Sequence, residues 1–588
     1  MNTRRRSIKL LTALASIALV ATACGGDDDD DAEPETTAGG ESATTEEAAT
    51  GSAATEGTDA GATGATDAGE EGGGEAAAGG ELIECGTFVG DPPEHIDPAL
   101  NSTLDAYQVI NALYDGLTDN DQETLEAKPH VAESFEANED ATVWTFTIRE
   151  GMAFSDGEQI LPSTFQRSWE RATDPDFAGE YSYLFNFIEG GAEKLAGEAD
   201  TITGVVADDD AMTLTVTLSA PYSNFPAVAG FQTFFPMPEG ASADPAGYEN
   251  SVMIGNGPYM MEAARTDEEI VLVKNEAWTG DINGDTWDDR LERMTFRTSA
   301  DPDTAYNAFE AGECDTANIP PARALEAQEN WGTTLDLQVL GSYHWFFNQR
   351  DPRIGGPENL KLRQAISQAI DRETINEAVF NGTRTNSTGI VMDGIPGFKP
   401  DMCDYCAYDP EAAQAAFDEW TAAGNALDGP LPIQFNAGAG HEDVAAIFVD
   451  NLAAIGIPAE ATPMPTEDYF SRLADGECVV CRAGWYADYP TYDNFMYDLF
   501  HQDSIGGNNH GYVSDEFDAL VDQGKQTVDP DEQAALFNQA EEILLNQDIG
   551  VIPINWYLGD YVYNDEKISN FPQTKLGIVL FEQLTLSA

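Results

Sequence analysis

The chain has 588 residues and a formal charge of −78, and 42% of its residues are hydrophobic. This length predicts more than one domain, and nine Trp, 20 Tyr and 28 Phe are enough for sizeable cores. The charge argues against nucleic acid and anionic membrane surfaces as partners, because both are themselves negative.

The first 24 residues have the pattern of an export signal. Three arginines, Arg4 to Arg6, precede the apolar run "LLTALASIALVATA", which is short for a transmembrane helix. The run ends in "ATAC", which resembles the bacterial lipobox, where the cysteine is lipidated and becomes the new N-terminus. We therefore expect 1–24 to be a lipoprotein signal peptide and Cys24 to anchor the protein on the outer face of the cytoplasmic membrane. The alternative is an ordinary secretory signal with an incidental cysteine.

The next segment, 25–80, is acidic and contains no aromatic residue, Leu, Ile or Val. Such a segment cannot bury enough apolar surface to fold, and its like charges extend it. We expect a disordered acidic linker between the lipid and the folded part.

From residue 81 onward, the pattern alternates between strand-like and helix-like runs. Residues 141–152 and 211–220 alternate apolar and polar side chains, which predicts strands. Residues 359–380 have helical periodicity, with a stop at Asn381 and Gly382, and 531–547 form a second helical pattern with Asp531 near its start. No internal repeat is present in the sequence. The mixture predicts an α/β or mixed α+β assembly of more than one lobe.

Six cysteines remain after Cys24, and an even count in an exported protein suggests disulfides. Two C-x-x-C pairs, 403/406 and 478/481, also raise the question of zinc, but they lie about seventy residues apart, unlike the two halves of a zinc ribbon. If 478–484 is one strand, Cys478 and Cys481 are about 10 Å apart and must pair elsewhere. A turn there would allow local pairs, which we slightly favour.

Signatures of catalysis are scarce. The sequence contains no G-x-S-x-G, no Walker loop and no second histidine after His441-Glu442 to complete a zinc-protease motif. Residues 281–292, "DINGDTWDDRLE", match a calcium loop at several places but lack the glycine at its sixth position. We expect an acidic surface loop there, with calcium binding as the alternative, and we assign no catalytic residue, metal or cofactor.

Several stretches, in order, resemble one family. They are "IDPALNSTLDAYQVINALYDGL", "WTFTIREGMAFSDGEQILPSTFQRSWERATDP", "IGNGPYMMEAARTDEEIVLVKNEAW", "AFEAGECDTANIPPA" and "NLKLRQAISQAIDRE". Together they are similar to the extracellular solute-binding proteins, family 5, the peptide-binding lipoproteins of bacterial ABC transporters. The resemblance covers essentially 81–588.

The resemblance implies a bilobal fold like that of periplasmic binding proteins, with an additional small domain and a hinge between the lobes. Lobe I would comprise 81–120, 251–315 and 556–588, the extra domain 121–250, and lobe II 316–555. The lobes would close around a solute and present it to a membrane permease, so the partners would be short peptides and the permease subunits, and the protein itself a monomer. The resemblance also implies a disulfide between Cys85 and Cys314.

The decapeptide "CRAGWYADYP", 481–490, resembles the oligopeptide-binding branch most closely. The resemblance gives Asp488 the peptide's α-amino group and Arg482 its C-terminal carboxylate. Trp485 and Tyr489 would wall the side-chain pockets, and Gly484 would let the peptide backbone approach. The chemistry agrees, because a zwitterion needs an acceptor at one end and a donor at the other.

Alternatives remain for the ligand and for the class of protein. The same fold could take an oligosaccharide, a nickel chelate or another small molecule, and Trp residues could stack on sugars as well as on peptide side chains. An ion pair for Arg482 and a turn or helix cap for Asp488 are the structural alternatives. A surface hydrolase or an adhesin is the remote alternative, against which the missing nucleophile motif and the absence of repeats speak.

Overall fold

The computed structural model describes residues 79–587 apart from 178, 281–286 and 505–510. The expected signal peptide, Cys24 and nearly all of the acidic linker lie outside the described residues, and so does the first half of the expected calcium loop. Within the described part of the chain, no helix combines the length and apolarity that crossing a membrane requires.

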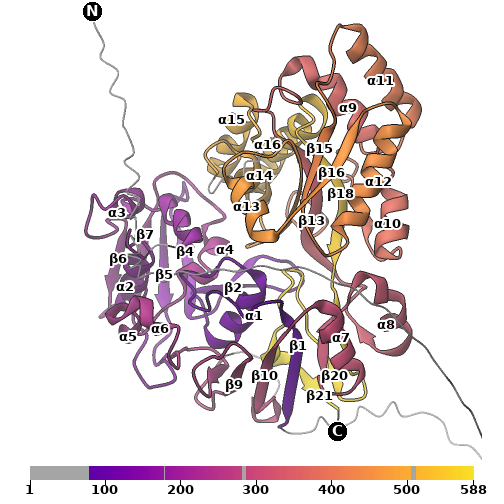
Figure 1. Ribbon diagram of the computed structural model, residues 1–588. Coiled ribbons are helices and arrows are strands. Elements are labelled where there is room, and N and C mark those ends of the chain that lie inside the picture. The colour runs from indigo at the N-terminus through magenta and orange to yellow at the C-terminus, as the bar shows by residue number, and fades with distance from the viewer. Residues whose placement is uncertain (1–78, 178, 281–286, 505–510, 588) are drawn as a thin grey trace, which may run out of the picture. The chain divides into compact units, whose positions relative to one another are not determined.

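The first sheet has seven strands, in the order β12-β19-β11-β1-β10-β9-β8 (Figure 1). Its central strand β1 pairs in parallel with β10 and β11, and the remaining pairs are antiparallel. Three helices accompany it: α1 (Leu104–Leu113), α7 (Pro302–Glu310) and α8 (Ala324–Asn330). The strands are β1 (Glu81–Val89), β8 (Tyr259–Met261), β9 (Glu269–Lys274), β10 (Arg293–Ser299), β11 (Thr316–Asn318), β12 (Gly332–Thr333) and β19 (Tyr561–Tyr563).

The second sheet is a four-stranded antiparallel sheet in the order β4-β5-β7-β6. The two strands predicted from alternation are β5 and β7 of this sheet, where the alternate apolar residues are buried. Helix α2 (Pro162–Ala172) and a 3₁₀ segment, Glu180–Phe187, pack beside it. The strands are β4 (Ala132–Ala137), β5 (Val143–Ile148), β6 (Val205–Asp208) and β7 (Thr213–Thr217).

Short elements connect these two sheets. A hairpin of β2 and β3 precedes the four-stranded sheet, and β20 pairs with β21 near the C-terminus. The elements are β2 (Thr118–Asn120), β3 (Ala127–Pro129), β20 (Ile568–Asn570), β21 (Thr585–Leu586), α3 (Gly191–Leu195), α4 (Phe225–Val228), α5 (Glu239–Ala243) and α6 (Pro245–Tyr248).

The third sheet has six strands, in the order β14-β18-β13-β17-β15-β16. Its strands are β13 (Gln338–Phe347), β14 (Thr385–Asn386), β15 (Leu431–Asn436), β16 (Ala459–Met464), β17 (Val480–Tyr486) and β18 (Val551–Leu558). Its helices are α9 (Leu360–Ala369), α10 (Arg372–Phe380), α11 (Pro410–Ala422), α12 (His441–Ala454), α13 (Thr466–Ala474), α14 (Asp493–Phe500), α15 (Asp515–Gln526) and α16 (Pro530–Glu542).

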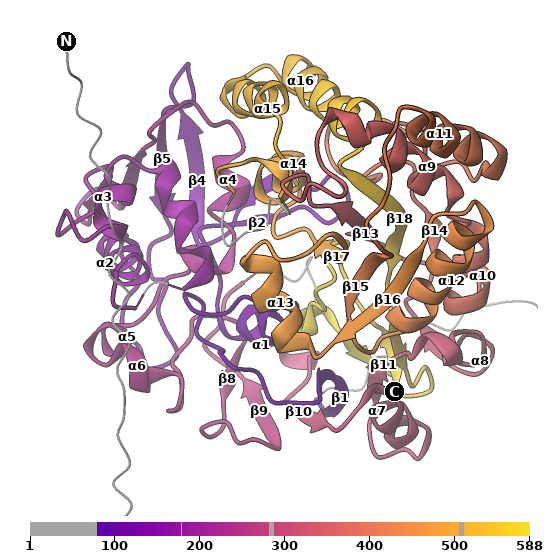
Figure 2. The same cartoon turned by 45° about the horizontal axis from the view of Figure 1, so that its top comes forward.

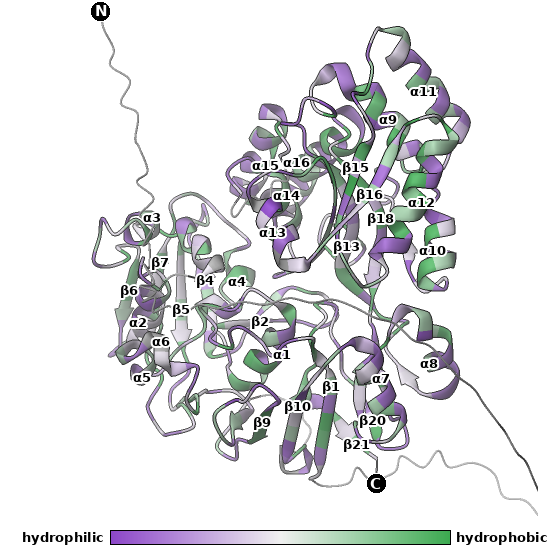
Figure 3. Cartoon of the chain, in the orientation of Figure 1, coloured by the Kyte–Doolittle hydropathy of each residue, from purple (hydrophilic) through white to green (hydrophobic). Residues whose placement is uncertain are grey.

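Both faces of this sheet are covered, because its central strands are apolar on both sides. On β13, Trp345 and Phe347 join the core beneath α9 to α12, whereas Phe346 joins the core beneath α14 to α16. Figure 2 shows these two groups of helices on opposite sides of the strands, and Figure 3 shows hydrophobic residues along the strands between them. A strand buried on both faces is a near-continuous apolar run, as β13 is.

Both predicted helices differ in detail from the observed ones. The run 359–380 forms two helices, because Asp371 caps α10 by accepting a hydrogen bond from the backbone N–H of Thr374 at 3.0 Å. The predicted stop is confirmed, since Asn381 takes the left-handed conformation with φ 53°. The second helix begins at Pro530, one residue before Asp531, and its cap is Asp529. It continues after Glu542 as a π-helical turn, Ile543–Gln547.

The structure joins the six described cysteines in three disulfides. Cys85 of β1 pairs with Cys314, with a Cα–Cα distance of 6.0 Å. The C-x-x-C pairs 403/406 and 478/481 close on themselves, at 5.4 and 6.1 Å. The second pair is local because β17 begins at Val480, so Cys478 lies in the turn before the strand. Zinc is not needed to explain these cysteines.

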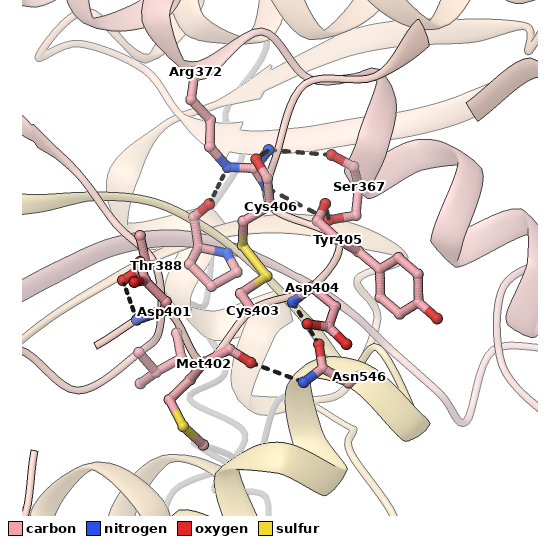
Figure 4. The surroundings of a disulfide bond; sticks show 12 residues. Ser367, Arg372, Thr388, Asp401, Met402, Cys403, Asp404, Tyr405, Cys406 and Asn546 are labelled. Carbon is pink, nitrogen blue, oxygen red and sulfur yellow. Dashed lines mark hydrogen bonds between the residues drawn. A yellow bond between two sulfur atoms is a disulfide. The ribbon is translucent and has the colours of Figure 1, made fainter. Parts of the chain in front are cut away.

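The 403/406 disulfide lies within the loop that follows β14, near Arg372 at the start of α10 (Figure 4). The buried Arg372 donates to the carbonyl oxygens of Cys406 at 2.7 Å and Pro553 at 2.6 Å. On the other side of the loop, Asn546 donates to the carbonyl of Met402 at 2.8 Å. The loop is therefore fixed to the start of α10, to β18 and to the π-helical turn.

The chain crosses between the seven-stranded and six-stranded sheets twice. One crossing lies between Thr333 of β12 and Gln338 of β13, and the other between Leu558 of β18 and Tyr561 of β19. Both crossings come later in the chain than the expected boundaries at 315/316 and 555/556. The division into two lobes and an extra domain remains our proposal, with these two crossings as its hinges.

Candidate ligand-binding site

Strand β17 carries most of the expected site. It lies in the middle of the six-stranded sheet, antiparallel to β13 and parallel to β15. Gly484 is opposite Tyr343 and Trp485 is opposite Ser342. The strand ends at Tyr486, so Asp488 lies just beyond the sheet, where the chain turns toward α14.

A cavity of about 240 Å³ lies at this end of β17. Gly484, Trp485 and Asp488 form part of its wall. Other parts of the wall come from segments outside the six-stranded sheet, among them Leu104 and Tyr107 of α1, Tyr181 of the 3₁₀ segment, Phe231 and Leu576. The cavity is thus bordered by the end of β17 and by helices and loops from distant parts of the chain.

Asp488 is held in place by two donors on different elements. The hydroxyl of Tyr181 donates to one carboxylate oxygen at 2.9 Å, and the side-chain amide of Asn494 donates to the other at 3.1 Å. Asn494 also accepts from the backbone N–H of Asp488 at 3.1 Å and from the indole N–H of Trp485 at 3.0 Å. One amide therefore orients both the acid and the aromatic wall beside it.

Both carboxylates near this amide have raised pKa values. Burial raises the pKa of Asp488 to about 7, and the nearby Asp498 adds to the shift, while the hydrogen bonds from Asn494 and Tyr181 oppose it. Burial likewise raises the pKa of Asp498 to about 6. Among the described residues, no basic side chain forms an ion pair with Asp488. An ammonium group brought to Asp488 would relieve this shift, because it would favour the charged carboxylate.

Gly484 has a second role besides lining the cavity. A Cβ at this position would collide with the hydroxyl of Tyr557 and would lie 3.1 Å from the Arg482 guanidinium. The absence of a side chain at Gly484 therefore makes room for the Tyr557 hydroxyl.

Arg482 lies on the same strand but not on the wall of this cavity. Its guanidinium is 5.1 Å from the centre of the Tyr343 ring and donates to Asn436 at 3.3 Å and Tyr557 at 3.4 Å. Burial lowers the pKa of the neighbouring His441 to about 3, and Arg482 adds to the shift, so that imidazole is neutral. Within the part of the chain that the structure describes, no carboxylate forms an ion pair with Arg482.

The two aromatic residues of the motif are placed differently. Trp485 is half-buried on the cavity wall. Tyr489 is 1% exposed and belongs to the core of the four-stranded sheet, where its hydroxyl donates to Asp498 at 2.7 Å. Tyr489 is therefore a core residue that supports the Asp498–Asn494 contact, and it does not wall this cavity.

Sequence reasoning missed several members of the site. Tyr181, Tyr107 and Phe231 come from segments hundreds of residues away from Asp488, and nothing in their local sequence marks them as binding residues. Asn494 lies only six residues after Asp488, in "DYPTYDN", but an asparagine at a helix start is most often a cap.

A mixed α/β chain whose separate sheets meet at one cavity has the architecture of a binding protein that closes around a small solute. The model of the bacterial extracellular solute-binding proteins, family 5, matches residues 126–507. The chain belongs to this family.

Three comparisons illustrate the relationship. The chain is 24% identical over 505 residues to the oligopeptide-binding protein OppA of Bacillus subtilis, covering 83% of this chain and 90% of that protein. It is 27% identical over 502 residues to the probable deoxycholate-binding periplasmic protein YgiS of Escherichia coli, covering 81% of this chain and 91% of YgiS. Its structure resembles that of the murein tripeptide binding protein MppA of Escherichia coli, with a TM-score of 0.74, 23% identity, and coverage of 87% of this chain and 99% of MppA.

These findings confirm the expected family and the mixed α/β fold of a periplasmic-type binding protein. Membership of the family makes the chain an extracytoplasmic solute-binding protein and not an enzyme. The relatives are named for different solutes, so the solute of this chain has to be argued from its own residues.

Proposed function

We propose that this chain is the substrate-binding lipoprotein of an ABC transporter and that it captures short peptides. The observation that carries the proposal is the cavity-lining carboxylate of Asp488, which has two neutral donors and no basic partner among the described residues. A peptide's α-ammonium group supplies the missing charge, and a charge-assisted hydrogen bond in such a site contributes about 1.5–3 kcal/mol.

Arg482 supports the other end of the same ligand. Its guanidinium donates to Asn436 and Tyr557 and faces the ring of Tyr343, and among the described residues its Nε–H has no acceptor, so it keeps a donor for an anion. A carboxylate at the C-terminus of a peptide is such an anion. Because Arg482 lies outside the wall of the Asp488 cavity, only peptides long enough to extend along β17 would reach it.

Closure of the lobes would couple binding to transport. The hydrogen bond from Tyr181 to Asp488 joins the extra domain to the end of β17, and two further bonds join Tyr222 and Asn224 to Asp493 of α14, at 2.5 and 2.9 Å. A solute that contacts both sides of the cavity stabilises the closed form by its additional contacts there. The closed, loaded monomer would be the form that the permease subunits bind, with Cys24 holding it at the membrane.

A second candidate is a non-peptide solute in the same cavity. The rings of Tyr107, Tyr181, Phe231 and Trp485 line the wall, and such a wall suits a bulky apolar or sugar-like molecule as well as a side chain. The name of YgiS, a probable deoxycholate-binding protein, shows that a relative is assigned a solute of this kind.

Calorimetric titration with trialanine and N-acetyl-trialanine tests the proposal. Asp488→Asn should weaken trialanine binding by about 30-fold or more, because the ligand's ammonium loses its charged partner in a desolvated site. Acetylation should weaken wild-type binding by a similar factor, and the two losses should not add, since both remove one interaction. Asp428→Asn, a change of the same charge at an exposed position, is the control.

Equal binding of free and acetylated peptide by the wild type would contradict the role of Asp488. Binding of deoxycholate or a sugar, with no binding of any tri- to pentapeptide, would establish the second candidate.

A further inference from the structure

A second and larger cavity adjoins the one bounded by Asp488. It has a volume of about 480 Å³ and lies among the β2–β3 hairpin, the end of α1 and the C-terminal segment of the chain. Tyr107 and Leu576 belong to the walls of both cavities. Tyr107 is half-buried on both walls, and the pKa of its phenol is raised by burial and then by the charges of Asp119 and Asp488. A solute anchored at Asp488 can therefore extend past Tyr107 into the second cavity.

The C-terminal segment presents a carboxylate to this cavity. Thr574, Leu576, Ile578 and Leu580 line the wall, and so does Glu582 in the 3₁₀ turn Phe581–Gln583. Glu582 is 9% exposed. Its carboxylate accepts a hydrogen bond from the side-chain amide of Gln583 at the long distance of 3.5 Å, and a contact with its own backbone N–H opposes the rise of its pKa. Burial raises the pKa of Glu582 to about 7, and the charges of Asp115 and Asp119 add to the shift.

Four of the other charged side chains on this wall form two ion pairs. The imidazole of His130 lies 3.1 Å from Asp115, and the ammonium of Lys128 lies 3.1 Å from Asp119. Arg149 is exposed and donates its Nε–H to the carbonyl oxygen of His130 at 2.7 Å. Among the described residues, no basic side chain forms an ion pair with Glu582, and the side-chain oxygen of Asn120 on the same wall has no hydrogen-bond donor.

Two acceptors without adequate donors, in a cavity that also has aromatic walls, favour a cation. Tyr107, Tyr114, Phe235 and Trp278 line the same space. Aromatic faces attract ammonium and guanidinium groups, and a desolvated carboxylate binds them through charge-assisted hydrogen bonds. An anion would instead meet Glu582, and a neutral apolar group would leave both acceptors unsatisfied.

We infer that this cavity is a subsite for a cationic group of the solute and that Glu582 binds it. In the context of the proposed function, on which this inference rests, the cation is a lysine or arginine side chain of a peptide whose α-amino group is at Asp488. A polyamine carries the same chemistry without a peptide backbone.

Titration with matched peptides isolates the charge. One set of three peptides is trialanine with a single alanine replaced by lysine at the first, second or third position. A matched set carries norleucine in the same positions, because norleucine keeps the hydrocarbon stem and lacks the ammonium. Trialanine itself is the reference for both sets. At least one lysine peptide should bind about tenfold or more tightly than its norleucine partner. Glu582→Gln should remove the preference for lysine while the affinity for trialanine stays within about twofold of the wild type. The control Glu133→Gln, at an exposed position on β4, should keep the preference for lysine.

Equal binding of lysine and norleucine peptides by the wild type, or a lysine preference that survives Glu582→Gln, overturns the cationic subsite and leaves the peptide function standing. If no peptide binds, the peptide function fails, and titration with spermidine then decides the subsite separately. Spermidine binding that Glu582→Gln weakens about tenfold would support the subsite, and binding that it leaves unchanged would overturn it. Thermal unfolding without ligand shows whether each variant is folded.

Discussion

Replacing Gly484 by alanine tests the packing that sets the end of β17. The added Cβ would collide with the Tyr557 hydroxyl, and the Tyr557 side chain has little room to move. It is 8% exposed, and its ring stacks on that of Tyr486 with the centroids 4.8 Å apart. The same hydroxyl accepts a hydrogen bond from Arg482 at 3.4 Å, so moving it also disturbs the guanidinium.

The expected cost follows from the collision. Adding one methyl group to a well-packed core typically costs about 1–3 kcal/mol, and the clash with one side-chain atom places this change in that range. Gly484 lies in a regular strand and has no left-handed φ, so backbone strain adds nothing. Tyr557→Phe removes the colliding oxygen, and the next protein atoms would lie at 3.1 and 3.4 Å from the Cβ. The double variant should therefore recover most of the loss, with a coupling of about 1 kcal/mol or more.

Urea unfolding of the wild type, both single variants and the double variant measures this coupling. The midpoints should show Gly484→Ala destabilised alone and largely rescued in the Tyr557→Phe background. Additive effects of the two changes would show that the Tyr557 hydroxyl does not occupy the space above Gly484, and the reasoning would then be wrong. Gly424→Ala does not serve as a control, because its φ of +91° adds strain, whereas Gly240→Ala on α5 meets no atom and should cost far less.

Three further predictions concern pH, the disulfide and the membrane anchor. The pKa of Asp488 is raised to about 7, and its ionised form binds the ammonium. Affinity for trialanine should therefore fall about tenfold per pH unit from pH 7 to 5. A flat pH profile of the affinity in calorimetry would contradict this. The groups that face Asp488, namely Tyr181, Asn494 and Asp498, do not reverse the trend, since protonation of Asp498 near pH 6 also removes negative charge from the site. Non-reducing peptide mapping should join the tryptic fragments of Cys85 and Cys314, and Cys85→Ser with Cys314→Ser should lower the unfolding free energy by about 2–5 kcal/mol; free thiols at both would refute the bond. Cys24→Ser should release the protein into the medium, and retention of that variant at the membrane through an uncleaved signal would argue against a lipid anchor.

The family could be predicted from the sequence because short local motifs carry the resemblance, and the position of the candidate site was inferred from one of them. The decapeptide 481–490 places Gly484, Trp485 and Asp488 within a few residues on one strand and the turn after it, so local geometry already brings them to one end of that strand. The alternating strands 143–148 and 213–217 were equally predictable, because their buried faces depend on side-chain period alone.

Local strings were insufficient where an interaction came from a distant segment. The role expected for Tyr489 differs from its place in the structure, because the four-stranded sheet, more than 200 residues earlier, packs over it. The run 359–380 looked like one helix because periodicity continues through 370 and 371, while the cap that divides it needs only one aspartate. The pairing of Cys478 with Cys481 depended on the residue at which β17 begins. The pattern of apolar residues in the sequence does not determine that residue.

The sequence by itself determined the family, the mixed α/β class and the expectation of export, and it singled out the carboxylate of Asp488. These depend on composition, on the spacing of apolar residues and on short motifs, which need no knowledge of tertiary contacts. Only the tertiary structure decided what surrounds that acid. Tyr181 and Tyr107 reach the cavity from two different elements, Asn494 of α14 donates to the acid, and Glu582 reaches the adjoining cavity from the C-terminal segment. These contacts exist because separate sheets pack together across hundreds of residues, and the free energy of that packing is not encoded in any one segment.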